Sequence, residues 1–142
     1  MRTNRRRRTL APLLSRVLPD LGVLRLDAEA VSRDPEVVRD YRTDPLNHTG
    51  KMVARTGAEL MATALAMPQR LPSLTMPLLV LHGTADRLVP PAASEVVRAH
   101  AGSPDLTLKV YEGLFHEPHN EPEKDDVLDD VVTWLDEHRT AT

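Results

Sequence analysis

The strongest constraint on the fold is an uninterrupted apolar run, Leu-Leu-Val-Leu at residues 78–81, which follows a proline and ends in a turn containing Gly83. A strand with one solvent-exposed face alternates apolar and polar residues. This run does not alternate, so it predicts a strand buried on both faces, as in a parallel sheet covered by helices. Residues 106–111 do alternate, which predicts a second strand near a sheet edge. Two strands make no stable sheet alone, and no third segment of comparable quality exists, so we expect part of the sheet to be missing.

A helix is expected after each strand. Pro90 and Pro91 open a helix that runs through Ala101, with Gly102 as its C-cap. Pro122 opens a last helix with an apolar stripe on one face and acidic residues on the other. The order strand, helix, strand, helix predicts an α/β fold in which the two strands are parallel neighbours. The apolar stripe of the last helix comprises Val127, Val131 and Trp134.

The first half of the chain is expected to form helical pieces that are broken by prolines. Asp34 is expected to be the N-cap of a helix that ends before Pro45. Residues 53–67 carry apolar side chains at helical spacing, and Pro68 is expected to end that helix. We therefore expect a basic disordered tail (1–9), a helical segment (10–71) and an α/β portion (72–142).

Composition limits the partners and the compartment. The net charge is −3, with an excess of arginine before residue 72 and of acidic residues after it. The tract Arg5–Arg8 could touch nucleic acid or anionic lipid, but such tracts are more often solvated tails, and we expect no nucleic-acid partner. There is no cysteine, which excludes disulfides and fits a reducing compartment. Residues 10–14 are too short an apolar run for a secretory signal, so we expect a soluble, cytoplasmic chain.

Two polar side chains follow the two expected strands. Asp86 stands after the first strand and His116 after the second. Because the carboxyl ends of parallel strands open at the same edge of a sheet, the two side chains can meet there. An aspartate that accepts Nδ1–H from a histidine holds the tautomer of a general base, so the pair is typical of the acid and base of a Ser-His-Asp triad. Taken singly, Asp86 could be a turn residue bonded to its own backbone, and His116 a surface residue.

The other histidines do not indicate a metal site. His82 ends the first strand and is expected to be packed and hydrogen-bonded. His116 and His119 are three residues apart, and Pro118 prevents the helix that would place two metal ligands on one face. We therefore expect no metal. Three further histidines are expected on the surface: His48, His100 and His138.

The nucleophile of such a triad is missing from the sequence. In the chain order Ser, Asp, His, the serine stands upstream on a Gly-x-Ser-x-Gly elbow. No serine of this sequence stands between two glycines at that spacing. The sequence therefore carries an acid and a base without a nucleophile. The serines are Ser15, Ser32, Ser73, Ser94 and Ser103.

These motifs together resemble one family. Leu-His-Gly-Thr-Ala-Asp at 81–86 and Tyr-Glu-Gly-Leu-Phe-His at 111–116 are similar to segments of the monoacylglycerol lipase family of α/β-hydrolases, that is, serine aminopeptidase S33 or lysophospholipase-like proteins. The resemblance covers about residues 10–139 and lacks the half that would carry the nucleophile. Further similar segments are residues 32–38 and 44–46, in the cap region of bacterial members, and residues 120–123 with Trp134, in the last helix.

The resemblance implies the C-terminal part of an α/β-hydrolase sheet, preceded by a mostly helical cap at residues 10–71. Asp86 would be the triad acid and His116 the base, while Leu88 and Val89 would line the acyl pocket. The substrate would be a small lipid ester, and no cofactor is implied. The leucines of the cap suit either a lipid chain or the cap's own packing. We also expect the cap to touch a membrane surface transiently.

The full-length ancestor is expected to be a carboxylester hydrolase of the monoacylglycerol lipase type, and the sequence as given is expected to be inactive. A thioesterase, peptidase or lactone hydrolase on the same scaffold is one alternative, because fold does not fix substrate. A non-catalytic fragment, either a truncated gene product or a partner-binding module that completes another sheet, is the other. Because a strand edge would lack its partner, we expect the chain to self-associate.

Overall fold

The structure of the chain is a computed structural model, and it describes residues 15–139. The expected basic tail at 1–9 lies outside the described residues. The chain forms two compact units, one with residues up to Leu26 and His48–Met67, the other with Asp27–Asn47 and the residues from Pro68 on. Residues 27–47 thus pack with the second half of the chain. The domain boundary expected after residue 71 does not follow this division and stays a prediction.

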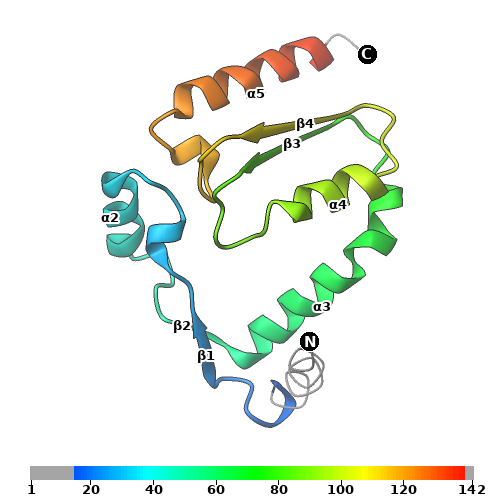
Figure 1. The fold of residues 1–142 in the computed structure, drawn as a ribbon. Coiled ribbons are helices and arrows are strands. Elements are labelled where there is room, and N and C mark those ends of the chain that lie inside the picture. Colours follow the sequence, from blue (N-terminus) through cyan, green and yellow to red (C-terminus); the bar gives the residue numbers. More distant parts are fainter. Residues whose placement is uncertain (1–14, 140–142) are drawn as a thin grey trace. The chain divides into compact units, whose positions relative to one another are not determined.

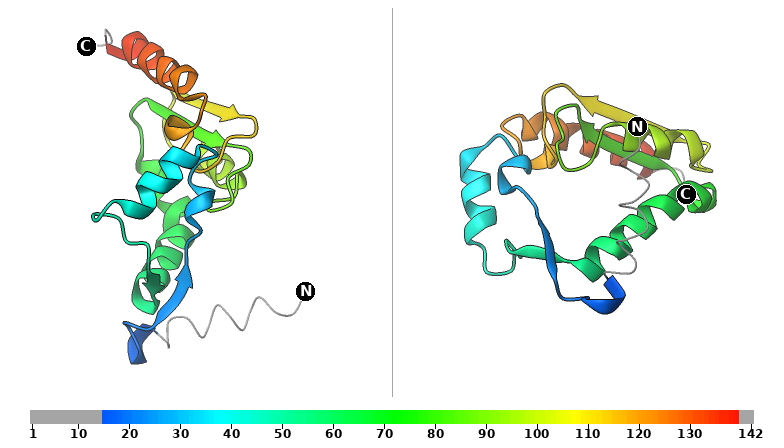
Figure 2. Two further views of the ribbon diagram at one scale, coloured as in Figure 1. Left: turned by 90° about the vertical axis from the view of Figure 1, so that its left-hand side faces the viewer. Right: turned by 60° about the horizontal axis from the view of Figure 1, so that its bottom comes forward.

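The second unit contains a parallel pair of strands, β3 (Leu78–Gly83) and β4 (Leu106–Tyr111), which pair along their whole lengths. α4 (Ala92–His100) connects them, and α5 (Lys124–Arg139) follows β4. Figure 1 shows α5 on one side of the strands and α4 on the other, and α5 keeps its own side in the turned views of Figure 2. The expected α/β order of strand, helix, strand, helix is confirmed.

Polar contacts attach α5 to the sheet. Lys109 and Tyr111 stand two residues apart on β4, so their side chains share one face of the strand. Both bind Asp130 of α5: the Lys109 ammonium forms an ion pair with Oδ1, and the Tyr111 hydroxyl donates to Oδ2 at 2.8 Å. Burial and the bond to Asp130 raise the pKa of Tyr111, which keeps the hydroxyl protonated as a donor. On the same helix Val127 is completely buried.

α2 (Pro35–Thr43) begins and ends as the sequence predicts. Oδ1 of Asp34 accepts the N–H of Glu36 at 2.8 Å, so the N-cap is formed. Pro35 occupies the first turn, where its missing N–H would have had no partner within the helix. The helix stops before Asp44, whose backbone is extended ahead of Pro45. A short 3-10 turn, η1 (Ala28–Ala30), precedes α2.

A buried contact of this unit lies where residues 30–32 run beside the loop that follows β4. Glu117 N–H donates to the carbonyl oxygen of Val31 at 2.9 Å, and the hydroxyl of Ser32 donates to the carbonyl oxygen of Asn120 at 2.8 Å. Both Val31 and Ser32 are buried, and so is Leu114 in the loop itself. A segment from the first half of the sequence thereby supports the loop that carries His116.

The first unit contains an antiparallel strand pair that the sequence analysis did not predict. β1 (Gly22–Arg25) pairs with β2 (Lys51–Val53), and α3 (Ala54–Arg70) starts directly after β2. The N–H of Ala54 donates to the carbonyl oxygen of Leu21 at 2.8 Å, which extends the contact into the helix. The expectation of helical pieces alone was wrong here, because strands this short show no periodicity and form only through pairing with a distant segment.

Two expected helix ends are also corrected. Pro68 lies inside α3, which continues to Arg70. A proline this close to the carboxyl end can distort only the last turn, so the helix tolerates it. Gly102 is not the C-cap of α4, because that place is taken by Ala101. The glycine serves a close approach instead: a Cβ on Gly102 would lie 2.1 Å from the carbonyl oxygen of Pro72.

Candidate active site

The turn after β3 packs against the loop after β4. The N–H of Thr84 donates to the carbonyl oxygen of Tyr111 at 2.9 Å. The N–H of Ala85 donates to the carbonyl oxygen of Leu114 at 3.0 Å. A Cβ on Gly83 would lie 2.2 Å from that same oxygen, so only glycine allows this approach. The two loops, and the polar side chains they carry, therefore lie side by side.

Asp86 ends the turn after β3, and its side chain is only 3% exposed. Oδ1 accepts the N–H groups of Leu88 and Val89, at 2.7 and 2.9 Å. Oδ2 lies 2.9 Å from Nδ1 of His116, within hydrogen-bond distance. Asp86 is therefore both a turn residue bonded to its own backbone and the partner of a histidine, because its two oxygens serve different groups.

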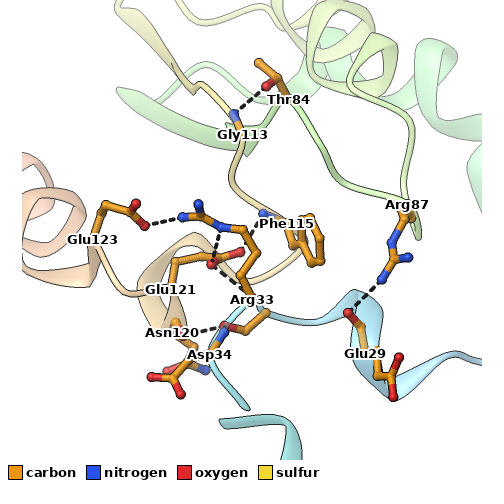
Figure 3. A network of polar contacts seen from close by, with 11 residues as sticks. Glu29, Arg33, Asp34, Thr84, Arg87, Gly113, Phe115, Asn120, Glu121 and Glu123 are labelled. Carbon is orange, nitrogen blue, oxygen red and sulfur yellow. Dashed lines mark hydrogen bonds and ion pairs between the residues drawn. The ribbon is translucent and has the colours of Figure 1, made fainter. Parts of the chain in front are cut away.

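His116 is presented by the loop after β4. Gly113 turns this loop with a φ of 76°, a region that favours glycine, and donates its N–H to Oγ1 of Thr84 at 2.8 Å (Figure 3). The imidazole of His116 is 37% exposed, so it remains accessible while Nδ1 meets Asp86. The geometry brings the two predicted site residues together at the carboxyl ends of adjacent parallel strands.

Hydrogen bonds decide the charge state of the Asp86 carboxyl. Burial raises the pKa of the Asp86 carboxyl, but the hydrogen bond from His116, the two backbone N–H groups and the charge of His116 outweigh it. The net result is a pKa below the usual 3.8, so the carboxylate is ionised at neutral pH and can only accept hydrogen bonds. Nδ1 of His116 is then the donor in this hydrogen bond, and in a neutral imidazole the free lone pair is on Nε2.

A second histidine approaches the same carboxylate. Nε2 of His82 lies 3.3 Å from Oδ2 of Asp86 and 3.2 Å from the carbonyl oxygen of Val89. Its side chain is mostly buried, as the sequence analysis expected for a packed histidine at the end of β3. The sequence analysis did not predict that His82 lies close to Asp86. Their spacing of four residues across a strand end and a turn gave no signal of it.

Leu88 and Val89 contact Asp86 through their backbone N–H groups. The side chain of Leu88 is half-buried and that of Val89 is exposed. A cavity of about 580 Å³ lies near by in the same unit, between α2, Arg87 and Phe115, and neither Leu88 nor Val89 lines it. The Arg87 guanidinium stands 4.8 Å from the centre of the Phe115 ring and donates to the carbonyl oxygen of Glu29 at 2.7 Å (Figure 3). The role of Leu88 and Val89 in an acyl pocket stays a prediction.

Two further features of the described residues bear on the Asp86–His116 pair, namely the serine hydroxyls and the possible metal ligands. Between residues 16 and 139 every serine hydroxyl donates to a backbone carbonyl oxygen. In that same part of the chain no three His, Cys, Asp or Glu side chains gather as a metal ion would require. The site as described holds a histidine hydrogen-bonded to a buried aspartate. The serines concerned are Ser32, Ser73, Ser94 and Ser103.

One buried acid near the site was missed by sequence reasoning. Glu121 is 0% exposed and binds Arg33 and the N–H of Phe115, the residue before His116 (Figure 3). The sequence shows Glu121 in a polar stretch between two expected elements, where periodicity cannot distinguish a buried side chain from an exposed one. An acidic residue followed by proline at the start of a helix is equally typical of a side chain that faces solvent.

Comparison with known proteins identifies the family of the chain. A family model described as serine aminopeptidase, S33, matches residues 2–123, which is most of the chain. The chain belongs to this family. The monoacylglycerol lipase of Mycolicibacterium smegmatis is 49% identical over 129 residues, which are 91% of this chain and 46% of that protein. The human monoglyceride lipase is 36% identical over 134 residues, or 93% of this chain and 44% of that protein.

Solved structures of the family share the fold. The crystal structure of the monoacylglycerol lipase of Paleococcus ferrophilus has a TM-score of 0.83 at 28% identity, covering 96% of this chain and 53% of that one. The α/β-hydrolase fold expected for this S33 family member is therefore confirmed. The chain spans about half the length of the relatives it matches.

Proposed function

We propose that the chain supplies the base and the acid of a carboxylester hydrolase of the monoacylglycerol lipase type. The observation that carries the proposal is the 2.9 Å contact between Nδ1 of His116 and Oδ2 of the buried Asp86. Support also comes from relatives named as monoacylglycerol and monoglyceride lipases, which match nearly the whole chain. In this proposal the serine nucleophile comes from outside these 142 residues, which hold no Gly-x-Ser-x-Gly segment.

In the proposed reaction His116 first accepts a proton and then gives it to the leaving group. Nε2 takes the proton of the serine hydroxyl while the serine oxygen bonds to the ester carbonyl carbon. When the C–O bond to glycerol breaks, the same nitrogen protonates the leaving alkoxide. Water then releases the fatty acid by the same two transfers. Asp86 stabilises the imidazolium formed in between and keeps Nε2 pointed at the reaction.

The substrate is proposed to be a small lipid ester. Leu88 and Val89 would contact its acyl chain, with Val89 38% exposed and so available for such a contact. Each methylene buried against such side chains contributes about 0.8 kcal/mol. The cap at residues 10–71 would cover the pocket. A thioesterase or peptidase that uses the same base and acid is the alternative.

The test joins this chain to a nucleophile. The segment of the Mycolicibacterium smegmatis relative upstream of the matched region is fused to it, and hydrolysis of monoacylglycerol and of a p-nitrophenyl ester is measured. We expect no turnover by the chain alone, turnover by the fusion, and a loss of roughly 10³-fold or more in His116→Ala. Full activity of the His116→Ala fusion would contradict the proposal. So would turnover by the unfused chain.

A partner-binding role is the second candidate, and the free edge of β3 favours it. Among the described residues β3 pairs with β4 alone, so its other edge offers unpaired N–H and C=O groups. Self-association through this edge belongs to the same proposal. The expected cytoplasmic location stays a prediction.

Contact of the cap with a lipid surface is proposed from exposed apolar side chains. None of the helices between residues 15 and 139 is long and apolar enough to cross a bilayer. The first unit nevertheless exposes several large apolar residues, which suit binding at an interface. Co-flotation of the chain with phosphatidylcholine vesicles would test this contact. The residues are Leu21, Val23, Leu24, Leu60, Met61 and Leu65.

A further inference from the structure

We propose that Glu121 is a positioning residue for His116. The proposal rests on the function proposed above, in which His116 is the general base. It assigns to Glu121 the task of holding the His116 loop so that Nδ1 stays within hydrogen-bond distance of Asp86. Glu121 itself touches neither substrate nor the reacting atoms.

The burial of Glu121 has to be compensated. Its side chain is 0% exposed, and an ionised carboxylate taken out of water is costly unless it is paired and hydrogen-bonded. Glu121 follows the 3-10 turn η3 (Pro118–Asn120) and precedes α5. At this place in the chain a glutamate could equally point into solvent. Its inward orientation therefore indicates a specific set of partners.

Those partners lie on both sides of the carboxylate. Oε1 accepts the N–H of Phe115 at 2.6 Å. Oε2 accepts the backbone N–H of Arg33 at 3.1 Å and its Nε–H at 2.9 Å. Figure 3 shows Glu121 between these two residues. One carboxylate thus joins the segment before α2 to the residue directly before His116.

The backbone of the His116 loop is held at three successive positions. Glu121 binds the N–H of Phe115, while the N–H groups of His116 and Glu117 donate to the carbonyl oxygens of Ala30 and Val31, at 3.4 and 2.9 Å. Residues 30–33 therefore form a support beside the loop, and Glu121 fastens that support through Arg33. The 3.4 Å contact of His116 is the longest of the three, so the neighbouring bonds must carry much of the restraint.

Catalysis is sensitive to this restraint because the His116 ring is partly exposed and its position relative to Asp86 depends on one hydrogen bond from Nδ1. Nδ1 meets Asp86, and 37% of the side chain is exposed. Asp86 itself is fixed by the N–H groups of Leu88 and Val89, so it cannot follow a displaced ring. A misplacement of about 1 Å in a catalytic contact can cost roughly a hundredfold in rate. Fixing Phe115 therefore matters for the base as well as for stability.

The test uses the full chain and NMR of its histidine ring nitrogens. Glu121→Gln keeps the shape, but an amide has one acceptor oxygen and an NH₂ group, which would oppose either Phe115 N–H or the Arg33 donors. Glu123→Gln is the matched control, because Glu123 binds the Nη2 of the same Arg33 from an exposed position, whereas the N–H of Phe115 binds Glu121. The readout is the Nδ1–H proton of His116 in its hydrogen bond, assigned by its loss in Asp86→Asn.

We expect Glu121→Gln to lose the His116 Nδ1–H signal while Glu123→Gln keeps it, with both variants folded by circular dichroism. Retention of the signal in Glu121→Gln overturns the positioning role. If that variant does not fold, Glu121→Asp replaces it: the shorter carboxylate cannot reach both partners, so the signal should weaken, and a signal of wild-type strength overturns the proposal. If neither variant folds, Glu121 is a core residue and the proposal is wrong. A wild-type chain without the signal would instead contradict the function proposed for Asp86 and His116.

Discussion

The carboxyl ends of β3 and β4 and the outer edge of β3 are built in opposite ways, although they belong to the same two strands. At the carboxyl ends, the turn after Gly83 donates backbone N–H groups to carbonyl oxygens of the loop before His116, and Asp86 has a partner for each oxygen. Along the outer edge, no described strand pairs with β3. Contacts within the chain therefore surround the proposed acid and base, whereas the outer edge of β3 has no strand partner among the described residues.

Self-association tests the open edge and should give the largest effect. An unpaired apolar edge is a template for pairing with another chain, so we expect oligomers of the purified chain in sedimentation velocity. The fusion with the upstream half of the Mycolicibacterium smegmatis relative is the control, because a strand from that half would cover β3, and it should sediment as a monomer. A monomeric chain with a cooperative melt would show that the edge needs no partner.

Gly83→Ala tests the carboxyl ends of β3 and β4, which are called the closed end below because the turn after Gly83 packs against the loop before His116 there. Its Cβ would lie 2.2 Å from the backbone oxygen of Leu114, so the two loops must separate. We expect about 3 kcal/mol of destabilisation, the upper end for overpacking. Gly113→Ala is the matched control: nothing lies within 4 Å of its Cβ, and only the left-handed backbone is penalised, by about 1 kcal/mol. Urea unfolding measures both, and equal losses would contradict the close packing of the loops.

The predicted features of this end are those with local signals. The bounds of β4 are those expected, since alternation over six residues is visible in the sequence. The cap of α2 depends on Asp34 and Pro35 alone, which are adjacent. The meeting of Asp86 and His116 needed one further rule, that parallel strands present their carboxyl ends together.

The features that escaped prediction depend on distant partners. β2 is three residues long and becomes a strand only by pairing with β1, more than twenty residues earlier. The burial of Glu121 depends on Arg33, 88 residues away. The packing of residues 27–47 with the second half has the same origin. Propensity and periodicity describe neighbours along the chain, so none of these could be read from them.

Acid should loosen the closed end through Asp86. The unfolded carboxyl titrates near 3.8 and the folded one below it, so its ionised form stabilises the fold. This contribution is fully present above pH 3.8 and is lost as the pH falls through the folded pKa. We expect Asp86→Asn to flatten the fall of the unfolding free energy below pH 4, measured by urea titration. Asp130→Asn is measured for comparison and should flatten the same fall of the unfolding free energy. The reason is that hydrogen bonds from Lys109 and Tyr111 lower the pKa of Asp130 too. An unchanged slope in Asp86→Asn would contradict the assignment.

The smallest effect is expected at the opposite end of the sheet, where His138 of α5 meets the residue before β4. Nδ1 of His138 lies 2.6 Å from the carbonyl oxygen of Trp134, and Nε2 lies 3.0 Å from Oδ2 of Asp105. Only the imidazolium can donate from both nitrogens, so the bond to Trp134 and then the one to Asp105 raise the pKa of His138 above its usual 6.5.

The ring of His138 stacks on Trp134 with centroids 3.9 Å apart, and this is the one tryptophan of the sequence. A protonated imidazole quenches indole emission more than a neutral one, so emission should rise with pH around a midpoint above 6.5. Because the folded pKa is raised, the stabilisation is present below pH 6.5 and is lost as the pH rises through the folded value. His138→Gln should abolish the transition, and Asp105→Asn should lower its midpoint. Emission independent of pH would contradict the contacts of His138 with Trp134 and Asp105. The carboxyl end of α5 would then lack its attachment to the residue before β4, just as the outer edge of β3 lacks a strand partner among the described residues.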